Sequence, residues 1–189
     1  MEHNGKQFTT VTTVLQFCNG YGHIPANILQ VAADRGQRAH SAIAARLKGL
    51  GSWGEDEDIQ GYLKSFELIS DRISDIQLIE HRFFDDERLL TGQLDMIARL
   101  DGILYVIDWK TSLRPNKTFP LQAAAYWQLS QSDATHACMI QLKKDGTKPN
   151  FYHYWPEELP THWEIFLKCY DIHKLFFEGK EREDFCFTI

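Results

Sequence analysis

The spacing of apolar residues predicts a short N-terminal element followed by a long helix. Residues 8–17 are mostly β-branched and apolar, which favours an extended piece or a short helix. From about residue 28 to residue 50, apolar positions recur with helical spacing. The apolar stripe of this helix consists of Val31, Ala39, Ile43 and Leu47. Gly36 inside the helix costs about 1 kcal/mol relative to alanine, so it indicates a break or a close approach by another group.

The next segments predict a second helix and then an antiparallel meander of strands. A Gly-rich acidic loop at 51–58 precedes a helix at about 59–69. Residues 75–84 have the composition of a first strand, and residues from about 88 to 100 that of a second. A hairpin turn then leads into a third strand, so the three strands are expected to be neighbours in one sheet.

The second half of the chain predicts a helix, two strands and a C-terminal helix. A helix at about 121–131 follows a proline, which suits a first helical turn. Residues 134–144 and 150–155 read as two further strands, and an amphipathic helix is expected at about 157–178, ending at Gly179. Its predicted core face consists of Trp163, Phe166, Leu167, Tyr170 and Leu175.

This order of elements predicts an α/β (α+β) fold with a mixed central β-sheet, in which an antiparallel meander is flanked by helices. A length of 189 residues suits a single domain covering 1–189. The expected core runs from about 31 to 155, and the helix at about 157–178 follows it.

The hairpin turn fixes the register of its two strands. Asp101-Gly102 is a strong two-residue turn sequence, because a type I′ turn needs positive φ at both central residues. If these two residues form the loop, the numbers of facing residues sum to 203. Asp95 is then opposite Asp108, and Gln93 is opposite Lys110. Because opposed residues share a face, two acids and one lysine are expected to converge there.

Opposed acids are unfavourable, by an amount within the roughly 0.2–1 kcal/mol range of cross-strand pair effects. A divalent cation between the two carboxylates would compensate this cost, with the neighbouring ammonium group of Lys110 as a second compensation. The alternative is that one aspartate is solvated at a strand end and that Lys110 pairs with the other, as surface ion pairs commonly do.

Composition and charge narrow the classes of function. The chain is 43% hydrophobic and 24% charged, as expected of a globular protein in water. The net charge of −6 disfavours a protein that coats nucleic acid by bulk electrostatics, although it allows a local basic groove. The sequence shows no membrane-spanning apolar run and no N-terminal signal pattern, so we expect a cytoplasmic location without membrane association.

Three motifs in order, GQLD, IDWK and QAAAY, resemble those of the PD-(D/E)XK nuclease superfamily. Their candidate catalytic residues are Asp95, Asp108, Lys110, Gln122 and Tyr126. The Q-x-x-x-Y pattern is similar to that of the RecB-like exonuclease branch, which implies a restriction-endonuclease-like core. The resemblance extends from about residue 31 to residue 130.

Two further positions match the branch. In GQRAH, His40 corresponds to the histidine that joins the metal shell, and in LIEHRFF, Glu80 corresponds to a recurring glutamate on the first core strand. Glu80 also has a structural interpretation, since it lies beside His81 and Arg82 in the sequence.

The resemblance implies a site for Mg²⁺ or Mn²⁺. Asp95 and Asp108 would supply hard oxygen ligands, with the backbone carbonyl of Trp109 as another and His40 as a nitrogen ligand. The cation would lower the pKa of its bound water and polarise the phosphate. We expect Lys110 to act electrostatically ahead of acting as a general base, because neighbouring acids favour the charged ammonium group.

The four cysteines contain no C-x-x-C pair, and we interpret them as free thiols. Some members of the branch bind an iron–sulfur cluster through one upstream cysteine and a C-terminal group of cysteines. Cys18 could correspond to the upstream cysteine, but Cys169 and Cys186 are too few and too far apart to form the C-terminal group. We therefore expect no iron–sulfur cluster.

The substrate contacts have two interpretations. Gln122 and Tyr126, one helical turn apart, either contact the substrate backbone or simply pack. Basic residues with the same ambiguity, between phosphate contact and solvation of a surface, are Arg35, Arg38, Arg114 and Lys117.

The leading hypothesis is a metal-dependent deoxyribonuclease, an exonuclease that acts on DNA single strands or duplex ends in recombination, repair or phage replication. A recombination or replication protein that delivers DNA ends is an expected partner. One alternative is a nucleic-acid-binding or protein-binding module that keeps the fold without turnover. Another is an endonuclease of the same fold, such as a restriction or junction-resolving enzyme.

Overall fold

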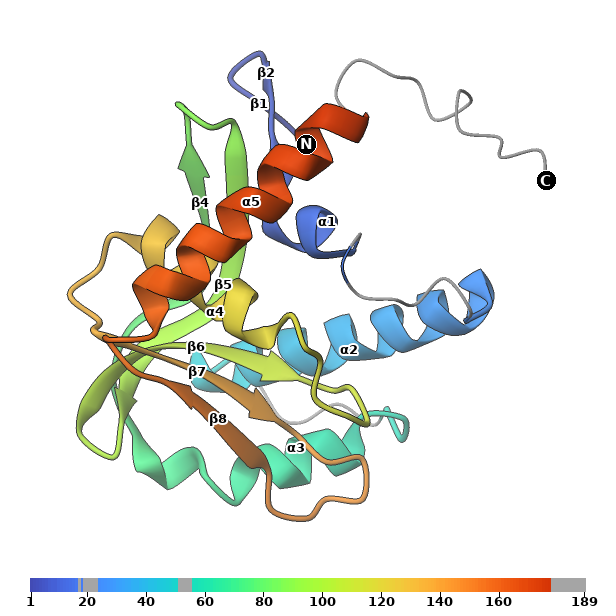
Figure 1. Ribbon diagram of the computed structural model, residues 1–189. Coiled ribbons are helices and arrows are strands. Elements are labelled where there is room, and N and C mark those ends of the chain that lie inside the picture. The colour runs from blue at the N-terminus through green and yellow to red at the C-terminus, as the bar shows by residue number, and fades with distance from the viewer. Residues whose placement is uncertain (17, 19–23, 51–55, 178–189) are drawn as a thin grey trace.

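The computed structural model describes residues 1–16, 18, 24–50 and 56–177. Its centre is a six-stranded mixed sheet with helices on both faces (Figure 1). The predicted fold class, an α/β arrangement with a mixed central sheet and an antiparallel meander flanked by helices, is confirmed. Most of the predicted loop at 51–58 and the predicted helix end at Gly179 lie outside the described residues.

The sheet has the strand order β3-β5-β6-β7-β8, and β4 pairs with β5. Its strands are β3 (Thr9–Thr10), β4 (Ile73–Asp85), β5 (Leu90–Leu100), β6 (Ile103–Lys110), β7 (His136–Gln141) and β8 (Asn150–Tyr154). The predicted meander β4-β5-β6 is antiparallel, whereas β7 runs parallel to β6. A parallel pair needs a crossover connection, and the helix between β6 and β7 supplies it.

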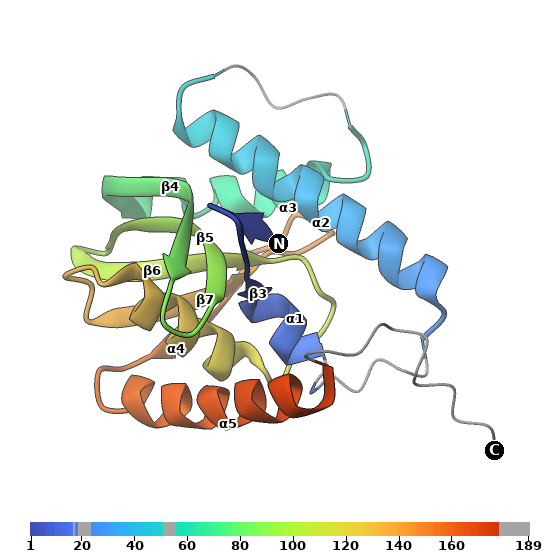
Figure 2. The ribbon, with the colours of Figure 1, turned by 90° about the horizontal axis from the view of Figure 1, so that it is seen from above.

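Helices cover the sheet on both faces (Figure 2). They are α1 (Val11–Gln16), α2 (Ala26–Leu47), α3 (Gln60–Glu67), α4 (Phe119–Ser130) and α5 (Leu159–Phe177). A single turn of 3-10 helix, η2 (Ser70–Arg72), precedes β4, and a two-stranded hairpin, β1 (Glu2–His3) with β2 (Lys6–Gln7), precedes β3. The helices α1, α4 and α5 pack on one face of the sheet, and α2 and α3 pack on the other.

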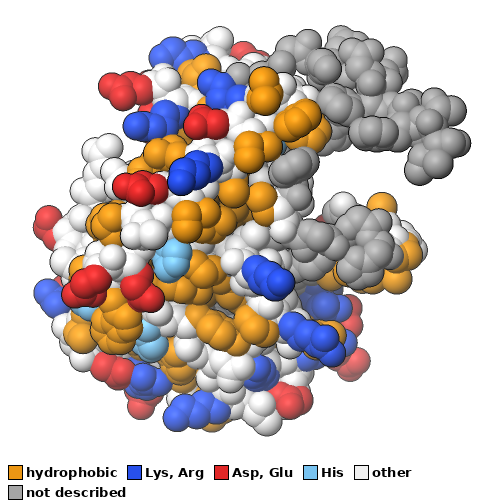
Figure 3. All heavy atoms as spheres, viewed as in Figure 1, with side chains coloured by type: hydrophobic (Ala, Val, Ile, Leu, Met, Phe, Trp, Pro, Cys, Tyr) orange, Lys and Arg blue, Asp and Glu red, His pale blue; other side chains and the backbone are white. Residues whose placement is uncertain are grey.

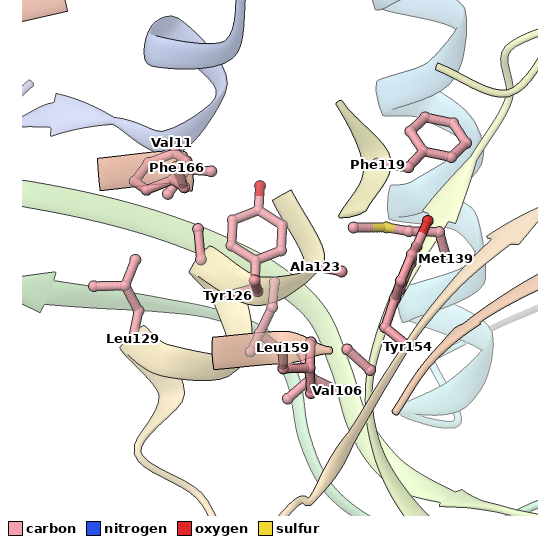
Figure 4. Packing of buried hydrophobic residues seen from close by; sticks show 14 of the residues in the cluster. Val11, Val106, Phe119, Ala123, Tyr126, Leu129, Met139, Tyr154, Leu159 and Phe166 are labelled. Atoms are coloured by element: carbon pink, nitrogen blue, oxygen red, sulfur yellow. The ribbon is translucent and has the colours of Figure 1, made fainter. Parts of the chain in front are cut away.

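Each face has its own hydrophobic core. Figure 4 shows the core under α4 and α5, where side chains from α1, β6, α4, β7 and α5 meet. On the opposite face Ile43 of α2 and Phe66 of α3 pack with Ile107 and Trp109 of β6. Because β6 is buried on both faces, its sequence is almost continuously apolar, and its polar residues Asp108 and Lys110 stand out.

The apolar stripe predicted on α2 is correct only in the second half of the helix. Ala39 and Ile43 are buried, but Val31 is 63% exposed. The first turns of α2 extend past the sheet (Figure 1), so the apolar residues there, such as Val31, are not buried by the described part of the chain.

The core face predicted for α5 is also only partly correct. Phe166 and Tyr170 are buried, and Trp163 packs against the same core. Leu175, predicted to belong to this face, is 77% exposed. The last turn of α5 lies beyond the sheet, which removes the surface that would bury it.

Gly61, in the first turn of α3, packs against the backbone of the β7–β8 connection. A Cβ atom at this position would lie 1.6 Å from the carbonyl oxygen of Lys144, and backbone cannot rotate aside. We expect Gly61→Ala to lower the free energy of unfolding by at least about 3 kcal/mol. The matched control is Gly36→Ala in α2, whose Cβ would approach only the hydroxyl of Thr111, at 2.9 Å. Equal losses for the two variants in urea denaturation would contradict this interpretation of Gly61.

Candidate active site

The Asp101-Gly102 hairpin forms as predicted. The φ angles of the two residues are 50° and 84°, the positive values that a type I′ turn requires. The guanidinium group of Arg72 holds the Asp101 carboxylate through bonds of 3.0 and 2.5 Å, and this hydrogen bonding lowers the pKa of Asp101. The strands pair with the predicted register from Leu100↔Ile103 to Met96↔Ile107.

The β5–β6 ladder ends one pair before the two acids. Asp95 and Asp108 are next in register, but they are not paired in the ladder, so the predicted direct opposition is wrong. The predicted pairing of Gln93 with Lys110 is wrong for the same reason, because these residues lie beyond the end of the β5–β6 ladder. The two strands separate at this point and form a fork.

A side chain replaces the missing backbone bond at the fork. The backbone N–H of Trp109 donates to Oδ2 of Asp95 over 2.7 Å, in a buried position. Further along β5, the strand β3 pairs with Thr91. The GQLD motif therefore lies on the stretch of β5 between these two contacts. Asp95 and Asp108 lie where β5 and β6 separate.

The two acids are buried and compensated by two basic groups. Asp95 is 7% exposed and Asp108 is 5% exposed. The ring nitrogen Nδ1 of His40 lies 2.9 Å from Oδ1 of Asp95, and because a carboxylate only accepts, this nitrogen carries the proton. The ammonium group of Lys110 lies 2.5 Å from Oδ2 of Asp108 as an ion pair.

Burial is the largest single effect on the pKa of Asp108 and on that of His40. The pKa of Asp108 is raised to about 6, because burial and the negative charge of Asp95 outweigh the opposing effects of Lys110 and His40. Burial lowers the pKa of His40, but the charge and hydrogen bond of Asp95, together with the charge of Asp108, outweigh burial, so the pKa is raised overall. The site therefore favours an additional positive charge beside Asp108.

Lys110 and the Q-x-x-x-Y residues form one hydrogen-bonded chain. Lys110 Nζ donates to Oε1 of Gln122 over 2.7 Å, and Nε2 of Gln122 donates to the hydroxyl of Tyr126 over 3.0 Å. Burial raises the pKa of Tyr126, so the hydroxyl remains protonated. Figure 4 shows that this hydroxyl points away from the Val106 and Leu159 end of the core.

Glu80 lies in the same cavity in an unusual backbone conformation. Its φ angle is 53°, a left-handed value that costs a non-glycine residue of order 1–3 kcal/mol. The neighbouring pairs Ile79↔Met96 and His81↔Leu94 place it across β4–β5 from Asp95. Its carboxylate accepts a hydrogen bond of 2.5 Å from the side-chain amide of Gln93.

These residues line one cavity of about 380 Å³ between α1, α2, the β4–β5 strands and α4. The lining includes His40, Glu80, Asp95, Asp108, Lys110, Gln122 and Tyr126 from the predicted set. Gly92 of GQLD makes room for the aromatic ring, because a Cβ there would lie 2.9 Å from a ring carbon of Tyr126. Lining residues that the sequence analysis did not single out include Thr10, Thr12, Arg82 and Gln93.

The four basic residues predicted to contact substrate do not line this cavity. Arg38 is held by Asp56 and Asp58, at 3.0 and 3.3 Å. Arg35 is half-buried on α2, and both Arg114 and Lys117 are exposed on the β6–α4 connection. In Figure 3 basic and acidic side chains are interspersed over the described part of the visible face, without a continuous basic field.

The donor set suits a hard divalent cation. Carboxylate oxygens are its preferred ligands, and Oδ2 of Asp108 is buried beside the ammonium group of Lys110 as an ion pair. The carbonyl of Lys110 accepts from Leu142 of the β7 side, so the carbonyl of Trp109 points to the opposite side, toward the fork. No three His, Cys, Asp or Glu side chains of the described ranges already enclose a cation-sized space.

The described cysteines are free thiols. Cys18 and Cys169 are in contact, with 3.6 Å between their sulfur atoms, and burial raises the pKa of Cys138 to about 12. Cys186 lies outside the described residues. None of the described helices combines the length and the apolar composition that crossing a bilayer requires.

Comparison with known proteins finds similar sequences among exonucleases. The chain is 30% identical over 164 residues to mitochondrial genome maintenance exonuclease 1 of Mus musculus, and 31% identical over 149 residues to that of Homo sapiens. The protein of the same name in Xenopus tropicalis is 29% identical over 165 residues. These alignments cover 79%, 70% and 79% of the chain. The chain spans about half the length of each relative, with 47%, 43% and 47% covered.

No protein-family model matches the chain. A solved structure described as the crystal structure of SSO0001 superposes with a TM-score of 0.45 at 16% identity, covering 88% of this chain and 78% of that chain. The sequence similarities to the three exonucleases support a relationship to a nuclease family.

Proposed function

We propose that the protein is a metal-dependent deoxyribonuclease that removes nucleotides from DNA ends in genome recombination, repair or replication. The observation that carries this proposal is the fork in the sheet, where two buried acids and a lysine converge on one cavity. The names of the three similar proteins support the exonuclease reaction. The order of the motifs supports the RecB-like branch of the nuclease superfamily.

The acids of the fork are the proposed ligands of Mg²⁺ or Mn²⁺. Asp95, Asp108 and the carbonyl of Trp109 would hold the cation. When bound, the cation would supply a water of lowered pKa and Lewis-acid polarisation of the phosphate. His40 acts through its hydrogen bond to Asp95, or through its second ring nitrogen, which carries the lone pair of the neutral ring. Glu80 adds a third carboxylate across the β4–β5 pair.

Lys110 is the proposed electrostatic catalyst. Its ammonium group lies between Asp108 and Gln122, and both contacts hold it at the cavity wall. A fixed positive charge there would stabilise the charge that develops on a phosphate in the transition state. Because Asp108 accepts one contact and Gln122 the other, the third ammonium proton remains available to a phosphate oxygen or to the attacking water.

The test is cleavage of end-labelled linear single-stranded DNA and of a closed single-stranded circle, with Mg²⁺, with Mn²⁺ and with EDTA. The proposal predicts mononucleotide or short products from the linear strand, an intact circle, and no reaction in EDTA. Linearisation of the circle would show that the protein is an endonuclease and would contradict the proposed exonuclease reaction. DNA binding without product from either substrate would indicate a binding module that keeps the fold.

Tyr126→Phe removes one hydroxyl from the cavity wall and keeps the ring that packs against Gly92. We expect cleavage to fall about tenfold, because a protonated donor that can reach a phosphate oxygen is lost and Gln122 loses an acceptor. The melting temperature should change by no more than a few degrees. Steady-state kinetics on linear DNA checks this, with Tyr170→Phe in α5 as the control outside the cavity. Unchanged cleavage by Tyr126→Phe would assign the residue to packing alone.

A further inference from the structure

Arg82 places a positive charge in the wall of the cavity and forms no ion pair with the described residues. The residue is on β4, and its side chain lines the same cavity as the two acids. One of its terminal nitrogens donates to Oε1 of Gln93 over 2.8 Å. Within the described ranges, no Asp or Glu oxygen lies at ion-pair distance from its guanidinium group. A guanidinium group has five N–H donors, so most of them are available to a ligand.

A carboxylate is close by but is occupied. Gln93 accepts from Arg82 with its amide oxygen and donates to Glu80 with its amide nitrogen, so the neutral side chain separates the acid from the base. Arg82 and Glu80 are two residues apart on one strand and reach the same neighbour. Without Gln93, the two charges would be free to pair with each other. The arrangement therefore keeps the positive charge of Arg82 available to the cavity.

The position of Arg82 relative to the acids is defined by the sheet. Gln93 and Asp95 are two residues apart on β5, and both line the cavity. Arg82 is the direct partner of Gln93 on β4. Arg82 therefore lines the same cavity as the proposed cation site, on the strand next to that of Asp95.

We propose that Arg82 binds the phosphate group next to the scissile phosphate, and that Gln93 keeps it available by holding Glu80. The proposal rests on the proposed function and identifies a second subsite of the same cavity, with a nucleic-acid phosphate as its ligand. A guanidinium group suits this ligand because its planar fork donates two parallel hydrogen bonds to two phosphate oxygens. The phosphate is either an internal diester or the monoester at a strand terminus.

The decisive variant is Arg82→Ala, measured by steady-state cleavage of linear single-stranded DNA. We expect KM to rise at least tenfold while kcat changes by less than about threefold, because the contact lies beside the reacting phosphate. The slope of log(kcat/KM) against log[salt] should become less negative by the amount that corresponds to the loss of about one phosphate contact. The charge-matched control is Arg99→Ala, whose guanidinium group lies outside the cavity, 3.1 Å from Asp75. Equal KM values and equal salt slopes for Arg82→Ala and the parent would overturn the proposal.

Two further arms identify the ligand and the role of Gln93. If the ligand is a terminal monoester, the effect of Arg82→Ala is larger on DNA with a phosphorylated end than on DNA with a hydroxyl end; an internal diester gives equal effects. Gln93→Ala should raise KM at least several-fold, because it frees Glu80 to pair with Arg82. An unchanged KM for Gln93→Ala would refute the separating role of the amide.

The two proposals fail in different ways. If the parent protein cleaves no DNA with either cation, the proposed nuclease function fails. If the parent protein cleaves DNA and Arg82→Ala matches it in KM and in salt dependence, only the phosphate subsite fails. Melting temperatures of all variants exclude unfolding as the cause of a higher KM.

Discussion

Asp108→Asn is expected to reduce cation-dependent cleavage of linear DNA at least about a thousandfold in kcat. The substitution keeps the size of the side chain and removes the negative charge that, with Asp95, makes the fork attractive to a divalent cation. The matched control is Asp145→Asn, in the β7–β8 connection, where the carboxylate bonds only to the neighbouring Thr147 in the described structure. Cleavage by Asp108→Asn within tenfold of the parent would contradict the assignment of this acid.

The same variant should be more stable than the parent when both are kept in EDTA at neutral pH. Burial raises the pKa of Asp108 to about 6 from an ordinary value of 3.8, so the folded state binds this proton more tightly than the unfolded state. The stability associated with that proton is fully present below about pH 4 and is lost as the pH rises through about 6. Above that range the buried charge costs the parent protein of order 2–3 kcal/mol.

Asp108→Asn removes this cost, so its melting temperature should exceed that of the parent by several degrees at pH 7.5 in EDTA. At about pH 4.5 the difference should shrink, because Asp108 is then mostly protonated in the parent. Differential scanning calorimetry at both values checks this. A variant that is less stable than the parent at pH 7.5 would contradict the unfavourable burial of the Asp108 charge.

Lys110→Met is expected to reduce kcat by roughly a hundredfold to a thousandfold, the range observed when a single group that stabilises developing charge is removed. The methionine side chain matches the aliphatic part of lysine and lacks the contacts to Asp108 and Gln122. Loss of the ammonium group also removes an effect that lowers the pKa of Asp108. Single-turnover cleavage isolates the chemical step from DNA binding.

Lys144→Met is the control for this variant, because Lys144 is exposed on the β7–β8 connection. It removes the same charge from the protein at a position outside the cavity. A loss of kcat that is equal in Lys110→Met and Lys144→Met would show that overall charge, and not the position at the fork, determines the rate.

The local sequence predicts the hairpin but not the fork. Asp101-Gly102 determines the turn, and the turn determines the register, so the five pairs from Leu100↔Ile103 onward follow from a few residues. The point at which the ladder ends depends on elements distant in sequence. The strand β3 takes over the edge of β5 at Thr91, and β7 holds the other edge of β6. Neither contact is visible in the hairpin sequence.

The helix α2 shows a prediction that helical geometry alone would have improved. Gly36 and His40 are four residues apart and therefore share a face, and both line the cavity. Arg38 is two residues from His40, so it lies on the opposite side of the helix, where it pairs with Asp56 and Asp58. The basic charge of Arg38 alone does not predict on which side of the helix, relative to His40, the side chain lies.

Arg82 was missed for a different reason. Arg82 is two residues from Glu80, so strand alternation predicts from the sequence that they share a face, and both line the cavity. What the sequence does not contain is the identity of the partner across the strand. The pairing of Arg82 with Gln93, and the bond from Gln93 to Glu80, come from the register of β4 on β5.

The most direct test of the central claim is anomalous diffraction from crystals of the protein grown with Mn²⁺. We expect an anomalous peak at the fork, within roughly 2.0–2.6 Å of a carboxylate oxygen from each of Asp95 and Asp108. The peak should be absent from crystals of Asp108→Asn grown in the same way. A fork without an anomalous peak at saturating Mn²⁺, or a peak bound by neither acid, would contradict the claim that this pair forms a divalent-cation site.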